Sequence, residues 1–88
     1  MELTPAEQHV LGRFAEKCRI AGGPRVGFVL RKASICYYAD EHPELDLEAG
    51  LGGLVEKGLL KVNEEGNLYF LTAAAAERLA AAGETVGA

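Results

Sequence analysis

The segment from residue 46 to residue 71 constrains the fold of this chain more than any other part of the sequence. It opens with Asp46, a residue suited to cap a helix N-terminus. An apolar stripe at helical spacing follows, made of Leu47, Leu51, Leu54 and Val55. Gly58 then stands where a glycine commonly closes a helix. The pattern predicts a helix over about 47–58, and the small residues among its turns require a packing or binding explanation.

A β-hairpin is predicted directly after this helix. Strand-like segments at 60–63 and 68–71 flank Glu64-Glu65-Gly66-Asn67, in which Gly66 is suited to a positive φ. Thr72 ends the second segment and can cap an alanine-rich helix over 73–82. The chain is predicted to form one domain over 1–83, followed by a disordered tail at 84–88.

The N-terminal third predicts two further helices. Thr4, Pro5 and Glu7 have the spacing of a capping box with proline at the first helical position, and Ala21-Gly22-Gly23-Pro24 ends that helix. The segment 26–30 reads either as a short strand or as the approach to a helix. We expect a brief extended piece and then a second helix from about Val29 to Glu41, before Pro43.

Charge is divided unevenly along a chain whose net charge is −4. Residues 1–32 carry six Lys or Arg and three acids, whereas residues 33–88 carry three cations and ten acids. The only surface suited to a polyanion is therefore the basic group between residues 13 and 32. Its members are Arg13, Lys17, Arg19, Arg25, Arg31 and Lys32.

Several classes of function find no support in the sequence. The spacings among Cys18, Cys36, His9 and His42 match no metal-ligand motif, and both cysteines fall on apolar faces. No nucleophile stands at a recognisable spacing from a base, so we expect neither an enzyme nor a cofactor. No apolar run approaches the ~20 residues of a membrane span, and a cytoplasmic location is the expectation.

The order helix, strand, helix, helix, hairpin, helix resembles the winged helix-turn-helix superfamily of small bacterial and archaeal regulators. Two segments carry the resemblance, Leu54-Val55-Glu56-Lys57-Gly58-Leu59-Leu60 and Tyr69-Phe70-Leu71-Thr72. They are similar to segments of MarR-, ArsR- and PadR-like proteins, in which the reading helix passes into the wing and the wing into a last helix. The resemblance covers nearly the whole chain.

The resemblance implies an α+β fold with a three-helix core, a two-stranded wing, room for a short third strand and an alanine-rich last helix. It implies a transcription-regulator-like protein whose helix at 47–58 enters the major groove of duplex DNA. Arg31 and Lys32 would then hold phosphates. The remaining candidate nucleic-acid contacts are Ala49, Gly52, Gly53, Lys57 and Lys61. A homodimer through the first and last helices would fit the same resemblance.

The residues of the third helix also support a different function. Asp46, Glu48 and Glu56 outnumber Lys57, and Glu64-Glu65 places like charge where a wing would meet phosphates. The alternative is a winged-helix module that binds an unknown protein partner instead of DNA, docking through Gly52, Gly53 and nearby apolar positions. The glycines could equally serve packing against a neighbouring helix. Tyr37 and Tyr38 could stack on bases or pack in the core.

Overall fold

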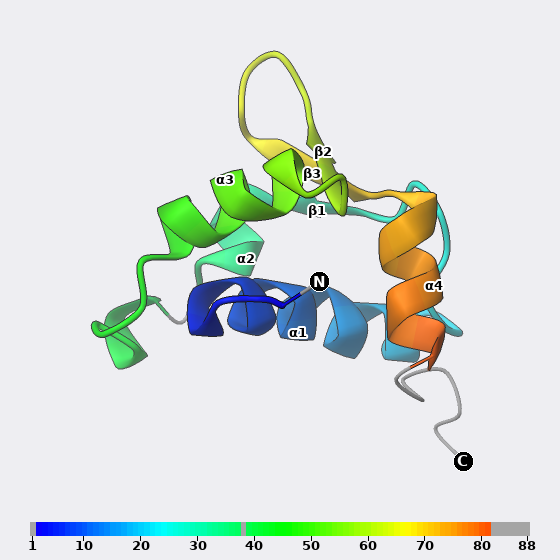
Figure 1. Cartoon of the computed structure of the whole chain (residues 1–88), viewed down its shortest axis with the longest axis horizontal. Helices are drawn as coiled ribbons and strands as arrows, with labels where there is room; N and C mark the ends of the chain where they lie inside the picture. The colour runs from blue at the N-terminus through cyan, green and yellow to red at the C-terminus, as the bar shows by residue number, and fades with distance from the viewer. Residues whose placement is uncertain (1, 38, 82–88) are drawn as a thin grey trace.

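The computed structural model describes residues 2–37 and 39–81, which form helices packed beside a three-stranded antiparallel sheet (Figure 1). The α+β class predicted from the sequence is therefore confirmed. In chain order the elements are α1 (Pro5–Ile20), β1 (Val29–Arg31), α2 (Lys32–Ile35), the 3-10 turn η1 (Ala39–Glu41), α3 (Leu47–Glu56), β2 (Leu60–Val62), β3 (Leu68–Leu71) and α4 (Ala73–Ala81).

Both long helices of the core begin at the caps that the sequence predicts. At α1, the Glu7 amide donates to Thr4 Oγ1 over 3.1 Å, and the Thr4 amide donates to Glu7 Oε1 over 2.8 Å. At α3, the Ala49 amide donates to Asp46 Oδ1 over 3.0 Å. These contacts satisfy amides that the helix itself leaves without partners.

The core lies between α1, α3 and one face of the sheet, and α4 stands beside the end of α1 (Figure 1). Its largest fully buried side chains include Phe14 of α1, Ile35 of α2, Leu51 and Leu54 of α3, and Leu71 of β3. The helix α3 runs close to α1, because a Cβ at Gly50 would come within 3.0 Å of the backbone of Ala6. A larger residue at this crossing would require α1 to shift by a few tenths of an ångström.

The sheet has the strand order β1–β3–β2, and its register separates a core face from an outer face. Tyr69 and Leu71 of β3 are buried, whereas Phe70 between them is only partly covered. Phe70 pairs with Val29 on one side and with Lys61 on the other. Because alternate residues of a strand point to opposite faces, Val29, Phe70 and Lys61 share the outer face.

The tip of the hairpin is organised by Asn63. Its Oδ1 accepts hydrogen bonds of 3.0 Å from the amides of Asn67 and Leu68, and its Nδ2 donates to the side chains of Glu65 and Asn67. Gly66 adopts a φ of +74°, as its place in the turn predicts. The hairpin therefore projects as a defined element and not as an irregular loop.

The prediction of a continuous helix from about Val29 to Glu41 is wrong. Residues 29–31 pair with β3 as an edge strand, and helix is found only at 32–35 and, as a 3-10 turn, at 39–41. The apolar residues at 29–30 fit a helical period. In the fold, however, they form backbone hydrogen bonds with the edge of β3, a strand about 40 residues further along the chain that local sequence patterns do not indicate. The short third strand therefore exists, and it lies at 29–31 and not at 26–30.

Other boundaries differ slightly from the predicted ones. The third helix ends at Glu56 and not at residue 58, and Gly58 follows it with a φ of +76°, so that the Leu59 amide donates to the Leu54 carbonyl over 2.9 Å. The first strand of the hairpin stops at Val62. The predicted tail at 84–88 lies outside the described residues.

One packing contact generates a pH-dependent prediction. The ring of His9 on α1 lies 4.8 Å from that of His42, measured between ring centroids, and His9 Nε2 is buried with no hydrogen-bond partner among the described residues. Burial lowers the pKa of His9 below its usual 6.5, the charges of His42 and Arg13 lower it further, and Glu44 acts in the opposite direction. The folded state therefore favours the neutral ring.

We expect the free energy of unfolding to fall as the pH drops below about 6.5, because the unfolded chain then binds the proton more readily than the folded chain. Urea titrations at pH 7.5 and pH 5 measure the loss. His9→Leu should lose less stability than the wild type over this interval. An equal loss in both proteins would contradict the assignment to His9.

Candidate functional site

The helix α3 buries its leucine stripe and presents a short row of residues outward. Leu47, Leu51 and Leu54 are buried, which leaves one exposed face. The exposed residues of α3 are Glu48, Ala49, Gly52 and Glu56. This face offers two carboxylates and no cationic or amide side chain, which is the reverse of what base edges and phosphates require.

Lys32, a predicted phosphate contact, is already engaged by α3. Its Nζ lies 2.5 Å from Glu48 Oε2, so the start of α2 is tied to the first turn of α3. The hydrogen bond to Glu48 raises the pKa of Lys32. The pair is largely exposed, so solvent screens it and it adds little to stability. Its main effect here is to neutralise a cation that reaches the exposed face of α3.

Lys57, predicted to flank a groove, is held inside the fold. Its Nζ forms an ion pair with Oε1 of Glu7 and donates to the carbonyl of Glu2 over 3.1 Å. The Glu7 carboxylate is only 3% exposed, and it is at the same time the capping-box acceptor of the Thr4 amide. The hydrogen bond from Lys57 and then that from Thr4 lower the pKa of Glu7, although burial acts in the opposite direction.

The three clustered glycines of α3 have different surroundings. A Cβ at Gly53 would overlap Oε2 of Glu7, and one at Gly50 would press on Ala6, whereas nothing lies within 4 Å of the corresponding position at Gly52. Internal packing therefore explains Gly50 and Gly53. Gly53 turns toward α1 and does not belong to the outward row, so Gly52 alone of these three glycines remains available to a partner, beside the exposed Ala49.

The remaining predicted contacts lie apart from one another. Lys61 is exposed on the outer face of the sheet, and Arg31 is exposed at the end of β1. Arg31 and Lys32 are adjacent in sequence, but Arg31 lines a hollow beside α1 while Lys32 reaches α3. The structure therefore does not assemble these cations around the exposed face of α3.

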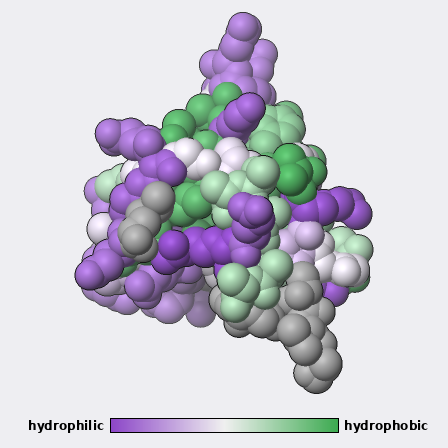
Figure 2. All heavy atoms as spheres, turned by 45° about the vertical axis from the view of Figure 1, so that its right-hand side comes forward, coloured by the Kyte–Doolittle hydropathy of each residue, from purple (hydrophilic) through white to green (hydrophobic). Residues whose placement is uncertain are grey.

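The β2–β3 hairpin adds further negative charge. Glu64 and Glu65 are exposed at its tip. Figure 2 shows the tip as a hydrophilic projection above a band of apolar atoms. Val62, 40% exposed, is one apolar residue at the base of this projection. The surface formed by α3 and the hairpin thus combines carboxylates with apolar and small residues.

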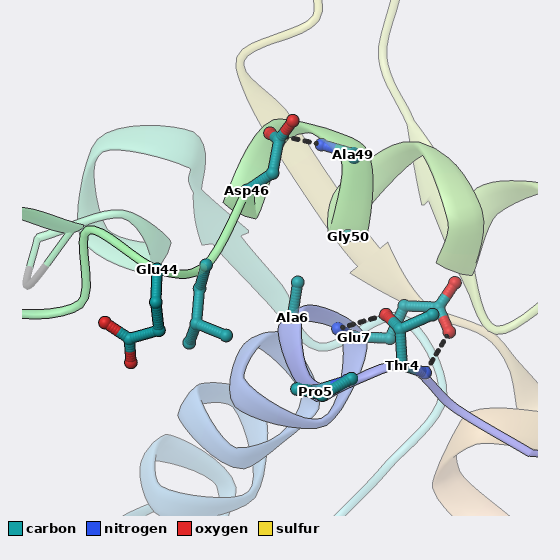
Figure 3. A pocket seen from close by; sticks show the side chains of 9 residues that line it. Thr4, Pro5, Ala6, Glu7, Glu44, Asp46, Ala49 and Gly50 are labelled. Atoms are coloured by element: carbon teal, nitrogen blue, oxygen red, sulfur yellow. Dashed lines mark hydrogen bonds between the residues drawn. The ribbon is translucent and has the colours of Figure 1, made fainter.

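A cavity of about 320 Å³ lies where the N-termini of α1 and α3 meet (Figure 3). Helix N-termini attract anions, but here Thr4 and Asp46 already accept from the free amides. The cavity is also lined by the carboxylates of Glu7 and Glu44. Both features disfavour an anionic ligand at this place.

Two further features concern metals and membranes. Within residues 2–37 and 39–81, no group of three His, Cys, Asp or Glu side chains could hold a metal ion. Burial raises the pKa of both Cys18 and Cys36, so neither is activated as a thiolate. None of the helices in the described part of the chain has the length and apolar character needed to cross a bilayer.

Sequence reasoning missed the partnership of Glu7 and Lys57. The capping box was visible, but a second role of its carboxylate depends on Lys57, 50 residues further along the chain. It also missed which members of the basic group come together, namely Arg13, Lys17 and Arg31.

No protein-family model, curated protein or solved structure matches this chain.

The two neighbouring glycines of α3 provide a matched test of the packing around Glu7. Gly52→Ala should raise the free energy of unfolding by about 1 kcal/mol, because alanine favours a helix and meets no neighbour. Gly53→Ala should give a lower free energy of unfolding than Gly52→Ala, because its Cβ would displace the end of the Glu7 side chain and weaken the ion pair with Lys57, which offsets the gain of about 1 kcal/mol in helix propensity.

Thermal unfolding of the two variants measures the difference. A change of 1 kcal/mol corresponds to about 4–8 °C in Tm for a domain of this size. If Gly53→Ala stabilised the protein as much as Gly52→Ala does, the Glu7 carboxylate would not be held against Gly53.

Proposed function

We propose that this chain is a winged-helix domain. The support is the order α1–β1–α2–α3–β2–β3, the sheet order β1–β3–β2, and a hairpin that projects beyond the end of α3 (Figure 1). In such a domain α3 takes the place of the reading helix and the β2–β3 hairpin takes the place of the wing.

We further propose that the domain is a protein-interaction module without enzymatic activity, and that α3 does not read DNA. One observation carries this proposal. The exposed surface of α3 and the wing bears four carboxylates against one exposed lysine, Lys61 of β2, while Lys32 and Lys57 are bound by carboxylates of the same chain. The four acidic residues are Glu48, Glu56, Glu64 and Glu65.

The physical argument concerns both affinity and readout. Phosphate binding is driven by cations that displace counterions, and this surface would bring acids to the phosphates. Base edges are read by side-chain donors and acceptors, and neither Ala49 nor Gly52 has any. The free energy of moving Lys32 and Lys57 onto DNA would also include the loss of their ion pairs with Glu48 and Glu7.

A protein partner fits the same surface better. Gly52 allows a backbone to approach α3, and Val62 supplies exposed apolar area on β2 of the hairpin. The surrounding carboxylates favour a partner segment with Lys or Arg at its margin, because complementary charge increases association rates and selectivity. The partner we expect is therefore a basic, partly apolar protein segment.

The first test measures whether the carboxylates of α3 and the wing prevent DNA binding. Fluorescence anisotropy of a mixed-sequence duplex at low salt should show no binding by the wild type. The triple variant Glu56→Lys, Glu64→Lys, Glu65→Lys should bind at about 10⁻⁴–10⁻⁶ M and lose affinity as salt rises. The control is Glu2→Lys, Glu41→Lys, Glu77→Lys, which has the same net charge but changes exposed acids outside α3 and the wing.

The control should bind much more weakly than the wing variant. Wild-type binding in the same affinity range, abolished by Arg31→Glu, would contradict the proposal and support a transcription-regulator-like DNA-binding domain instead.

The second test concerns the protein partner. Gly52→Leu should abolish recovery of the partner in affinity enrichment from the cells in which the protein occurs, because the leucine blocks close approach to α3. Ala74→Leu, at an exposed position of α4, is the matched control and should recover the partner as the wild type does. Circular dichroism verifies that both variants fold. Equal recovery by Gly52→Leu would exclude this face as the docking surface.

A further inference from the structure

A basic hollow lies beside α1, and the proposed docking function does not use it. Residues from the middle of α1, the end of β1 and α2 surround a volume of about 480 Å³. Its lining residues are Arg13, Glu16, Lys17, Arg31, Ala33, Ser34 and Tyr37. Three cations and one carboxylate thus meet in one concave place on a protein whose net charge is −4.

Arg13 forms a fixed part of this hollow. Its side chain is only 11% exposed; one terminal nitrogen lies 2.9 Å from Oε1 of Glu16, and the other donates to the carbonyl of Ser34 over 3.1 Å. The guanidinium is therefore oriented before any ligand arrives. A planar group held in this way loses little entropy when it binds an anion.

Lys17 and Arg31 supply the adaptable charges. Lys17 is one turn from Arg13 on α1, and Arg31 approaches from the end of β1. Across residues 2–37 and 39–81, no ion pair neutralises either of these two side chains. Two other basic residues of the N-terminal third are placed differently: Lys32 is paired with Glu48, and Arg25 lies over the ring of Phe28 at 5.6 Å.

Tyr37 adds an aromatic surface at the edge of the same hollow. It is 72% exposed, which is unusual for a large ring in a chain with few aromatic residues. Exposed aromatic rings next to basic side chains suit a ligand that combines a phosphate with a flat base. The volume lies in the range of small-molecule sites, about 300–1,000 Å³.

We propose that this basic hollow binds a nucleoside monophosphate. The phosphate monoester carries about two negative charges, which Arg13, Lys17 and Arg31 can offset, and the base lies against Tyr37. The hollow is formed by α1, β1 and α2, so it is separate from the exposed row of α3 and does not depend on the proposed docking function.

Isothermal titration calorimetry with AMP at low ionic strength tests this site. The wild type should bind with a Kd below about 1 mM, and the affinity should decrease with salt because the cations are partly exposed. Arg31→Gln and Lys17→Gln should each weaken binding about tenfold, the loss expected for one charge-assisted contact. Lys61→Gln removes an equal charge outside the hollow and should change the affinity less than twofold.

The contributions of phosphate and base are separated by two further titrations. Tyr37→Ala should weaken AMP and leave inorganic phosphate unchanged, and adenosine should bind the wild type much more weakly than AMP. An adenylate oligonucleotide is the last ligand. If it binds more tightly than AMP, and if Arg31→Gln weakens its binding by the same factor, the site is supported and its phosphate belongs to a single-stranded nucleic acid.

Three results would overturn the proposal. The first is no saturable heat with AMP up to about 5 mM, well above the Kd we expect. The second is an equal loss of affinity in Lys61→Gln and Arg31→Gln, which would indicate nonspecific attraction. The third is binding of duplex DNA without binding of AMP. Because these variants leave α3 unchanged, failure here would not affect the docking proposal.

Discussion

The buried carboxylate of Glu7 is the contact on which the arrangement of α1 and α3 depends. It closes the capping box at the start of α1 and forms an ion pair with Lys57, the residue that caps the end of α3. It also occupies the space that a side chain at Gly53 would need. A charge buried to this degree is tolerated only when it is paired and hydrogen-bonded. One side chain thus couples the start of α1, the end of α3 and the packing between these two helices.

This coupling has a consequence for function. The internal contacts that hold the domain together also remove cations from its surface. Lys57 is bound by Glu7, and Lys32 is bound by Glu48 across the gap between α2 and α3. What remains outward on α3 is small or acidic, and the tip of the hairpin is acidic as well. The fold alone therefore does not identify the partner, and the chemistry of the exposed surface is the better guide to it.

The basic residues of the N-terminal third illustrate how a fold redistributes charge. In the sequence all six form a single group, but in space five of them separate into three environments. Lys32 faces α3, Arg25 lies over Phe28, and Arg13, Lys17 and Arg31 surround the hollow beside α1. A chain with net negative charge can therefore retain one concave basic surface, formed by different elements from the acidic face of α3.

The sequence by itself determined the elements whose signals are local. The caps at Thr4 and Asp46, the leucine stripe of α3, the positive φ at Gly66 and the hairpin depend on residues close together in the chain, so their spacing predicts them. Tertiary structure decided what depends on distant partners. Residues 29–31 became a strand because β3 offered an edge, and Gly53 became a packing position because Glu7 reached it. No local pattern encodes a neighbour that the fold alone supplies.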